Sequence, residues 1–476
     1  MIAEYLDQDA TGLAAMVAAE QVSPAELTEC AIERIETLNP RLNAVVHTFY
    51  DRARAAAEQP LSGPFAGVPF LLKDILGDLA GEPTRQGSRL MPPVPAAQNA
   101  ELTDRFLAAG LNPLGKTNVP EFGLVGTTEP VLYGAAKNPW NTAHSTGGSS
   151  CGSACAVASG MVPIAHANDG GGSIRIPASA CGLVGLKPTR ARNPLGPVAG
   201  DIMAGLVQEH VVCRSVRDAA RMLDCTHGPG LGDPYAAPPA PASFGAALEG
   251  KGKRLRIAFT RTKMNGQPLH AECVAAAEAA AKLCESMGHH VEEASPPVDQ
   301  DTLIMPFMAL WSAGLAMQID YICQLTGQTP SLGNLEGLTF GLYQAGRVVT
   351  GPQVLGAAAA MQTVGRAVAA WHQTYDVWIT PTLGMPPIPN GLIDFSNTDA
   401  AESMAPMIDY VPFTALQNGT GQPAISLPLH WSADGLPVGV QFVAGVGEEA
   451  MLIALAGEIE AAAPWEPRCR AMRTAL

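Results

Sequence analysis

The sequence predicts an α/β protein built around one large core. Short apolar segments typical of buried strands alternate along the chain with segments of helical character. The chain has 476 residues, of which 47% are hydrophobic and 15% charged, so it can bury a sizeable core. A linker-like stretch at residues 236–241, AAPPAP, is interpreted as a surface crossing within a single domain.

The first long helix is predicted to begin immediately after Ser23. This serine is a suitable N-cap, Pro24 suits the first helical position, and Glu26 completes a capping box. Apolar residues then recur at helical spacing up to the pair Asn39–Pro40. That pair is expected to end the helix, because proline cannot donate a backbone hydrogen bond.

Two strands and one further helix are predicted by the same criteria. Residues 67–76, GVPFLLKDIL, form a short buried strand with Lys73 and Asp74 near its end. In a regular strand these two side chains lie on opposite faces of the sheet, so Asp74 need not hold Lys73 in its charged form. Residues 255–259 are expected to form a strand, and residues 271–287 a helix with Gly288 at its C-cap.

Composition excludes several classes of partner. The chain has 29 basic and 44 acidic residues, a formal net charge of −15, which disfavours nucleic acid and anionic membranes. The first residues are acidic where a signal peptide is basic, and no uninterrupted apolar stretch reaches the roughly 18 to 20 residues that span a bilayer. The ten cysteines form no CxxC pair or Cys/His array. We expect a cytoplasmic protein with free thiols and without a metal, cofactor, nucleic-acid or membrane partner.

Three segments contain residues that could perform chemistry. Lys73 interrupts an apolar run, either as a strand-end lysine whose amine reaches water or as a desolvated, neutral base. Residues 145–154, STGGSSCGSA, are either a flexible loop or the anion-accepting start of the helix that follows. Residues 166–179, HANDGGGSIRIPAS, contain three glycines whose N–H groups can closely approach a substrate oxygen. Neither glycine cluster has the pattern of a nucleotide-binding loop.

Taken together, these segments resemble the amidase signature hydrolases. The spacing between Ser149 and Ser173, 173 − 149 = 24 residues, also matches that family. The resemblance covers nearly the whole chain, through residues 116–118 (KTN), 138–140 (NPW), 181–189 (CGLVGLKPT), 376–382, 420–424 (TGQPA) and 435–441 (GLPVGVQ). The form of residues 166–179 is most similar to the branch that cleaves 6-aminohexanoate cyclic dimers, related nylon-type amides and carbamates.

The resemblance implies an overall fold and an assembly. The fold is a large mixed twisted β-sheet covered by helices on both faces, and the amidase domain spans residues 1–476. Within it, the catalytic core is expected at about residues 60–215 together with residues 370–445, and a variable substrate-pocket region at about residues 300–360. The expected partners are a small-molecule amide substrate and water, with a homodimer as the candidate assembly.

The resemblance also implies roles for individual residues. Lys73 is the expected base, Ser149 the proton relay held by a cis peptide bond after Gly148, and Ser173 the nucleophile that forms an acyl-enzyme. The oxyanion hole is expected at the amides of Gly170, Gly171, Gly172 and Ser173. The expected supporting residues are Ser150, Asp169 and Arg175. The expected substrate-pocket residues are Gly123, Leu124, Thr127, Met305, Met308 and Trp311.

Several positions depart from the family pattern. Cys151 stands where the family usually has glycine, and it is interpreted as a small buried thiol. Asn168 replaces a common threonine, and Gly170 replaces a threonine or isoleucine. We expect none of these departures to touch the triad, but together they mean that the substrate of any single relative does not carry over to this chain. Apolar residues at helical spacing between positions 304 and 315 are either an ordinary core stripe or an apolar substrate wall.

The leading hypothesis is a standalone hydrolase of neutral apolar amides, with carbamates and esters as additional substrates. The alternative is an amidotransferase A-type subunit that produces ammonia from glutamine within a multisubunit complex. A non-catalytic binding protein on the same scaffold is a third hypothesis. A Ser-His-Asp triad is the rival mechanism, with His144, His166 and His210 as candidate bases, although none of them belongs to a GxSxG elbow.

Overall fold

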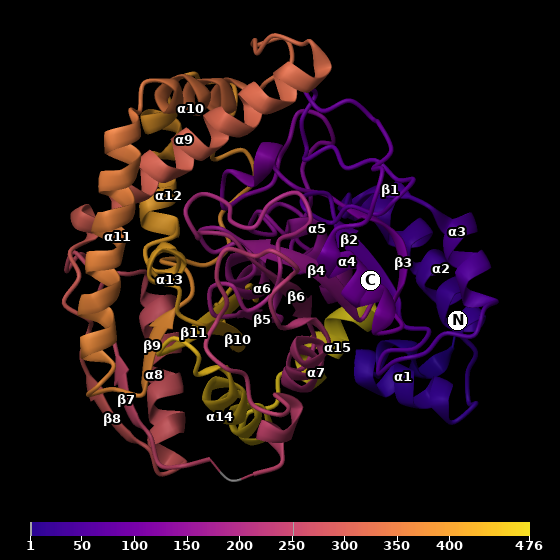
Figure 1. Cartoon of the computed structure of the whole chain (residues 1–476). Helices are drawn as coiled ribbons and strands as arrows, with labels where there is room; N and C mark the ends of the chain where they lie inside the picture. Colours follow the sequence, from indigo (N-terminus) through magenta and orange to yellow (C-terminus); the bar gives the residue numbers. More distant parts are fainter. Residues whose placement is uncertain (1, 251) are drawn as a thin grey trace.

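A mixed 11-stranded sheet runs through the molecule (Figure 1), and the computed structural model describes residues 2–250 and 252–476. The strand order is β1-β3-β2-β4-β6-β5-β10-β11-β9-β7-β8. The strands are β1 (Val45–Thr48), β2 (Pro69–Lys73), β3 (Asn112–Thr117), β4 (Ile164–Asp169), β5 (Val184–Lys187), β6 (Gln208–Cys213), β7 (Arg256–Phe259), β8 (His290–Glu293), β9 (Val377–Pro381), β10 (Ala424–Trp431) and β11 (Pro437–Ala444).

The pairing of the strands confirms the predicted mixed sheet. Strand β2 runs parallel to both β3 and β4, and β7 runs parallel to both β8 and β9. The pairs around the centre of the sheet, from β4 through β6, β5, β10 and β11 to β9, are antiparallel. Strands from the first half of the chain therefore meet strands from its last quarter at the β5–β10 pair.

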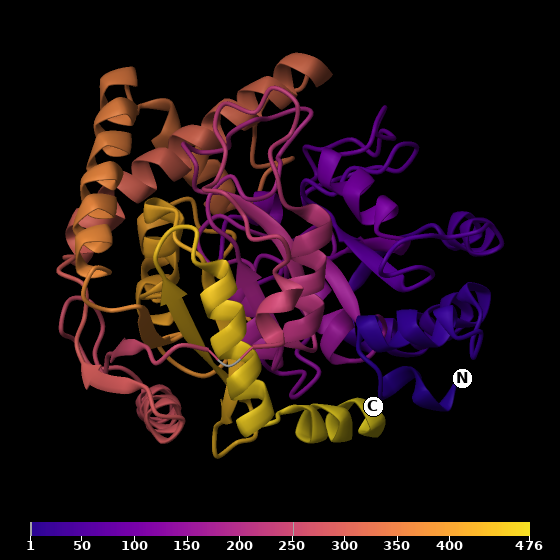
Figure 2. The same ribbon diagram turned by 60° about the horizontal axis from the view of Figure 1, so that its bottom comes forward.

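Helices cover the sheet on both faces, as expected (Figures 1 and 2). The two ends of the chain lie side by side, where Asp7 forms an ion pair with Arg470 of the last helix. The helices are α1 (Ala10–Ala18), α2 (Pro24–Leu42), α3 (Tyr50–Ala57), α4 (Glu101–Ala108), α5 (Cys151–Ala158), α6 (Arg175–Cys181), α7 (Val216–Thr226), α8 (Ala271–Ser286), α9 (Gln300–Thr326), α10 (Gly337–Arg347), α11 (Gly351–Trp371), α12 (Ala400–Tyr410), α13 (Thr414–Thr420), α14 (Glu449–Ala462) and α15 (Glu466–Ala475), with short 3-10 turns η1 (Ala3–Leu6), η2 (Glu121–Gly123) and η3 (Gly245–Leu248).

Helix α2 has the predicted start but a later end. Ser23 and Glu26 form the full capping box, and Pro24 occupies the first turn. The helix runs through Pro40 to Leu42, so the expected stop at Asn39–Pro40 is wrong. A proline in the last turn removes only one helical hydrogen bond, and the chain leaves the helix where Asn43 adopts a left-handed conformation.

The other predicted elements are confirmed with small shifts at their ends. Strand β2 ends at Lys73, so Asp74 belongs to the turn that follows it. Strand β7 and helix α8 lie within the predicted ranges, and Gly288 has a positive φ of 95° just beyond the C-cap of α8. The sheet therefore delivers a completely buried lysine to the end of a parallel strand.

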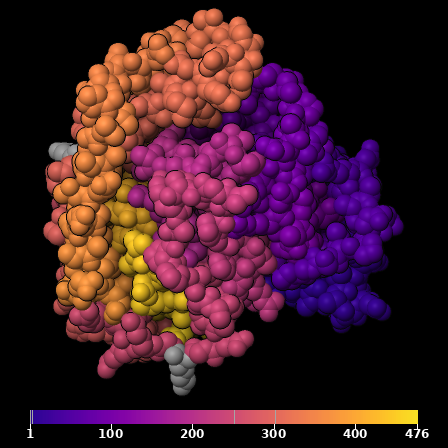
Figure 3. Space-filling view, in the orientation of Figure 1, coloured from indigo at the N-terminus to yellow at the C-terminus, as the bar shows by residue number. Residues whose placement is uncertain are grey.

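Helices α9, α10 and α11 lie together along one side of the molecule (Figures 1 and 3). Their buried side chains form an apolar layer, which is part of a second apolar cluster distinct from the main core. Residues Thr302–Thr326 of α9 include an 18-residue window with a mean hydropathy of 1.5, so this helix is long and apolar enough to cross a membrane by length and composition. The expectation concerned uninterrupted apolar stretches, and the apolar run of this helix is interrupted by Gln318 and Asp320. Within the fold 44% of the window is buried, and Leu315 and Ile319 are completely enclosed by the second apolar cluster.

Candidate active site

The candidate catalytic residues meet at one edge of the sheet. Strands β2 and β4 are parallel neighbours, so their carboxyl ends lie together. The first strand ends at Lys73, and the second ends at Asp169, which leads into the glycine loop and Ser173. The loop that contains Ser149 leads into α5, which packs against both strands.

The Lys73 amine is completely buried and surrounded by oxygen atoms. Its Nζ lies 2.8 Å from Ser149 Oγ and 2.5 Å from the side-chain Oδ1 of Asn168. The main-chain oxygen of Asn168 lies 3.4 Å away. The Asn168 amide is fixed in this orientation, because its Nδ2 donates a hydrogen bond to the main-chain oxygen of Ile75.

Burial lowers the pKa of the Lys73 amine to about 7, although the carboxylates of Glu209 and Asp169 raise it in part. A neutral amine has two N–H donors and one lone pair. The two oxygens of Asn168 can only accept, so they take the N–H groups. The lone pair is then left for the hydroxyl of Ser149, which is the arrangement that a base needs.

Ser149 and Ser150 are held by the backbone around them. The Gly148–Ser149 peptide bond is cis. The Ser150 hydroxyl donates to the main-chain oxygen of Asn168 and accepts from its N–H. Gly123 packs directly on Ser149, because a Cβ added at Gly123 would lie 3.1 Å from Ser149 Oγ.

A buried ion pair holds the glycine loop. Asp169 accepts hydrogen bonds from the amides of Gly172 and Ile174, at 2.7 and 3.1 Å, and from the guanidinium of Arg175. Burial alone would raise the pKa of Asp169, but the charges of Arg175 and Lys187 and hydrogen bonds from Arg175 and Asn418 lower it to about 2. The supporting role expected for Asp169 and Arg175 therefore has a direct physical basis in these contacts.

Three of the four amides expected at the oxyanion hole are open. The amides of Gly170, Gly171 and Ser173 form no hydrogen bond with any residue in 2–250 or 252–476. The Gly172 amide differs, because it is engaged by Asp169. Gly172 is instead required for its shape: its φ is +138°, and a Cβ would lie 2.3 Å from Thr414 Oγ1.

Ser173 stands between the loop and α6 with 7% of its surface exposed. Its hydroxyl has no hydrogen-bond partner within the described part of the chain. Gly171, two residues before Ser173, is the most accessible of the three loop glycines. The hydroxyl and the open amides therefore belong to the same short stretch of backbone.

Two aromatic rings of α9 lie against this loop. A Cβ added at Gly170 would lie 2.9 Å from the Trp311 ring, and one added at Gly171 would lie 3.1 Å from the Phe307 ring. The two rings stack on each other with centroids 5.4 Å apart and an interplanar angle of 19°. Side chains at positions 170 and 171 would displace this wall, which explains why the loop has glycine there.

The expected pocket residues are only partly brought together. Leu124 and Thr127 are buried in the loop beside Gly148, and the backbone of Thr127 contacts that glycine. Met308 is half-buried in the apolar layer. Met305 is 71% exposed and does not belong to the wall. It precedes Phe307 by two residues, a rotation of about 200° that places it on the opposite side of the helix.

Comparisons with known proteins identify the family of this chain. The family model described as Amidase matches residues 26–453. A 6-aminohexanoate-cyclic-dimer hydrolase of Paenarthrobacter ureafaciens is 37% identical over 473 residues, 97% of this chain and 96% of that protein.

The chain belongs to the amidase family.

Solved structures lead to the same family. A 6-aminohexanoate cyclic dimer hydrolase has a TM-score of 0.94 at 36% identity, covering 98% of this chain and 99% of that one. A bacterial aryl acylamidase of the amidase signature family has a TM-score of 0.87 at 27% identity, with the same coverage. This amidase is therefore an amide-hydrolysing enzyme with the amidase signature fold.

Sequence reasoning missed several residues that contact the site of this amidase. The prediction that the departures leave the triad untouched is wrong for Asn168, which binds the Lys73 amine. Thr414 donates to the main-chain oxygen of Gly171, and Asn418 donates to the main-chain oxygen of Asp169. Both residues belong to α13, directly before the family segment 420–424. Their position next to that segment was the one feature of the sequence that could have indicated their part in the site.

The histidines do not provide the base of a Ser-His-Asp triad. His166 Nδ1 accepts the Lys73 amide hydrogen, and its Nε2 contacts Glu209, so both ring nitrogens are engaged. His210 Nε2 contacts the main-chain oxygen of Ala219, and burial lowers the pKa of this histidine to about 4. His144 lies outside the glycine loop, at a bridge to Pro389.

The thiols next to the site are structural. Cys151 is completely buried at the start of α5, where its Sγ contacts the main-chain oxygen of Asn118. Burial raises the pKa of this thiol to about 12, so it is not a nucleophile near neutral pH. The ten cysteines are all free, and the described residues contain no group of three or more His, Cys, Asp or Glu side chains placed to hold a metal ion.

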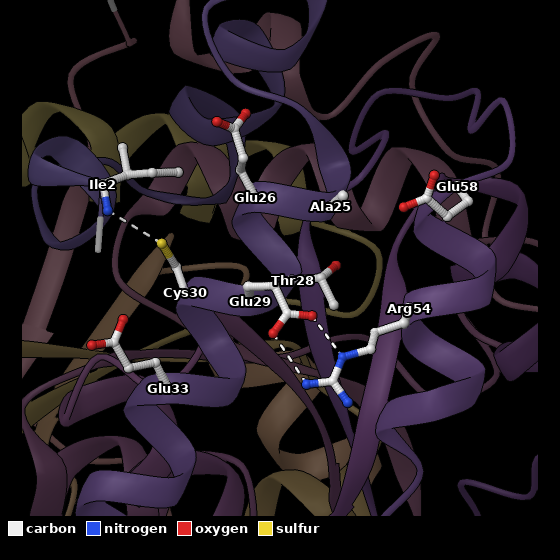
Figure 4. A pocket seen from close by; sticks show the side chains of 9 residues that line it. All are labelled: Ile2, Ala25, Glu26, Thr28, Glu29, Cys30, Glu33, Arg54 and Glu58. Carbon is white, nitrogen blue, oxygen red and sulfur yellow. Dashed lines mark hydrogen bonds and ion pairs between the residues drawn. The ribbon is translucent and has the colours of Figure 1, made fainter.

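An open groove between α2 and α3 lies apart from this site (Figure 4). It has a volume of 580 Å³ and is lined by Glu26, Glu29, Glu33 and Glu58 with Arg54. Arg54 pairs with Glu29 across it at 2.6 Å. None of the candidate catalytic residues lines the groove, so its size does not mark the catalytic centre.

We predict that Asp169→Asn destabilises the fold by about 3–5 kcal/mol, because it leaves the buried charge of Arg175 without its partner. The pKa of Asp169 is lowered to about 2, so its contribution is fully present above the unfolded pKa of about 4 and is lost as the pH falls through 2. Chemical unfolding at pH 7 and at pH 3 measures both effects.

The control is Glu29→Gln, which breaks the exposed pair with Arg54 and is expected to have a much smaller effect. Equal effects of the two substitutions at pH 7 would contradict the assignment of Asp169 as the anchor of the loop.

Proposed function

We propose that this protein hydrolyses neutral, apolar amides through a covalent acyl-enzyme, with Lys73 as base, Ser149 as relay and Ser173 as nucleophile. The observation that carries the proposal is the buried Lys73 amine in contact with Ser149, with Asn168 occupying its N–H groups. A lysine amine left neutral near pH 7 is a base rather than a partner for a charge.

The first step forms the bond between Ser173 and the substrate. The Lys73 lone pair takes the proton of Ser149 while Ser149 takes the proton of Ser173. The Ser173 oxygen then attacks the acyl carbon and forms the tetrahedral adduct. The hydrogen bond between the two serine hydroxyls is expected to form once a substrate is bound, as catalytic hydrogen bonds often do.

The negative charge of the adduct is received by the loop. The amides of Gly170, Gly171 and Ser173 are the proposed donors, since none of them is used within the fold. Each such donor typically contributes about 3–4 kcal/mol to the transition state. Thr414 and Asp169 hold the loop backbone, so the donors need no rearrangement at the moment of reaction.

The adduct collapses as the relay runs backward. The proton returns from Lys73 through Ser149 to the leaving nitrogen, the C–N bond breaks, and the acyl group stays on Ser173. A water molecule then attacks the ester while Ser149 and Lys73 accept its proton. Release of the carboxylic acid restores the Ser173 hydroxyl, so atoms and charge balance over the cycle.

The aromatic wall supports an apolar substrate. Phe307 and Trp311 of α9 pack against the loop that carries the open amides, so the acyl group of a substrate would contact their rings. A buried apolar surface favours neutral alkyl or aryl groups over the charged end of glutamine. This wall therefore favours a standalone amidase, with linear or cyclic amides, carbamates and esters as the substrate classes, over an ammonia-producing subunit.

We expect Ser173→Ala to abolish labelling by a fluorophosphonate and to reduce amide hydrolysis by at least about 10³-fold, because no other group can form the acyl-enzyme. Intact-protein mass spectrometry measures the labelling. Ser286→Ala, at an exposed serine at the end of α8, is the control and keeps full labelling. Labelling that survives in Ser173→Ala would place the nucleophile elsewhere.

The pH profile is expected to report the neutral form of Lys73. The pKa of the amine is lowered to about 7, so kcat/KM should rise about tenfold per pH unit below pH 7 and level off above it. Lys73→Ala removes the base and should lose about 10²–10⁴-fold in rate. Lys253→Ala, at an exposed lysine, is the control. A rate that falls between pH 6 and pH 8 would contradict a neutral amine as base.

A matched substrate panel tests the proposed specificity. The panel contains an amide and an ester with the same apolar acyl group, a carbamate with apolar substituents of matched size, a cyclic amide, and glutamine. We expect kcat/KM for the apolar amides to exceed that for glutamine by at least about 10²-fold, since the wall has no use for a polar side chain. Comparable turnover of glutamine, with copurification of a second subunit, would support the amidotransferase alternative instead.

A further inference from the structure

A histidine and a glutamate lie behind the Lys73 amine and take no part in the proposed proton relay. His166 on β4 accepts the main-chain N–H of Lys73 at its Nδ1, at 3.3 Å. The other ring nitrogen, Nε2, makes a very short contact with Glu209 on the neighbouring strand β6. Glu209 lies directly opposite Asn168 in the antiparallel pairing of these strands, so the pair adjoins the residue that binds the amine.

Hydrogen bonding determines the charge of this pair. Nδ1 of His166 is an acceptor, so the ring proton lies on Nε2 and is donated to Glu209. The ring is therefore neutral, so it does not cancel the negative charge of a Glu209 carboxylate. The carboxylate is 2% exposed, and its Oε1 has no hydrogen-bond partner in the described part of the chain.

The other titratable groups that face Lys73 or His166 contribute no comparable net charge. Asp169 on β4 is neutralised by its ion pair with Arg175. The Cys151 thiol on α5 is protonated, since burial raises its pKa to about 12. His210 on β6 is neutral, since burial lowers its pKa to about 4. Among the charged groups near the Lys73 amine, Glu209 thus raises its pKa the most.

We propose that the buried His166–Glu209 pair acts as a single negative charge that holds the Lys73 amine at the basicity the reaction needs. The inference rests on the proposed role of Lys73 as base. A lysine buried without a negative neighbour becomes a very weak base, and a weak base is a poor proton acceptor in catalysis. Glu209 opposes the effect of burial, while His166 supports the carboxylate and the Lys73 backbone together. Both are positioning residues, because neither touches the reacting atoms.

The test is the pH profile of kcat/KM in matched variants. The acidic limb is the part of the profile below about pH 7, where kcat/KM rises with pH. Glu209→Gln removes the charge and keeps a hydrogen-bond acceptor, so we expect the acidic limb to move to lower pH by about one unit. The rate on the alkaline plateau should fall, since the base is weaker. Glu209→Asp retains the charge and should keep the wild-type limb. A variant that merely loosened the structure would lower the rate without moving the limb.

Asn168→Asp separates this inference from the proposed function. It places a new carboxylate against the Lys73 amine and should move the acidic limb to higher pH. A raised limb in Asn168→Asp with an unmoved limb in Glu209→Gln overturns the role of the pair and leaves Lys73 as the base. Unmoved limbs in both variants overturn the pair together with Lys73 as the titrating group.

A measurement on the wild-type enzyme serves where Glu209→Gln does not fold. Nitrogen-15 NMR of histidine-labelled protein, assigned with His166→Gln, should show the Nε2–H tautomer of His166 at the pH of the activity assay. An imidazolium at that pH would cancel the charge of Glu209 and would overturn the proposal.

Discussion

The buried ion pair between Asp169 and Arg175 is the contact on which the rest of the site depends. Both side chains are completely enclosed, and Arg175 also binds Gln417 of α13 and Gln441 of β11. One guanidinium therefore joins the glycine loop to two segments that lie more than two hundred residues further along the chain. The loop amides keep their positions because separating the buried Asp169 carboxylate from the Arg175 guanidinium would leave an unpaired buried charge.

A second constraint is that the Lys73 amine is completely buried and still has hydrogen-bond acceptors within reach. Burial alone would leave a buried amine without a defined orientation. The two oxygens of Asn168 assign its N–H groups and leave the lone pair facing Ser149. Asn168 stands where the family commonly has threonine. Because its Nδ2 donates to the main-chain oxygen of Ile75, its Oδ1 must face the Lys73 amine as an acceptor.

The third constraint is the fit between α9 and the glycine loop. Trp311 and Phe307 lie so close to Gly170 and Gly171 that a Cβ at either glycine would contact the rings. The three successive glycines thus have two different causes: two of them make room for an aromatic wall, and Gly172 supplies a backbone conformation. The proposed substrate wall and the proposed oxyanion donors are for this reason two sides of one contact.

The amino-acid sequence by itself determined the α/β class, the capping box of α2, the buried strand with Lys73 near its end and the family to which the chain belongs. These follow from local patterns and motif order, which need no knowledge of distant contacts. The tertiary structure decided what those motifs touch. Asn168 binds the Lys73 amine because the sheet and its loops set the direction of its side chain. The same loops leave the amide of Gly170 open, whereas the amide of Gly172 is bound by Asp169. Glu209 behind His166 is brought in by strand pairing, and Met305 is turned away by the rotation of a helix. None of these has a signal at short range, because each is a meeting of residues that only the folded chain brings together.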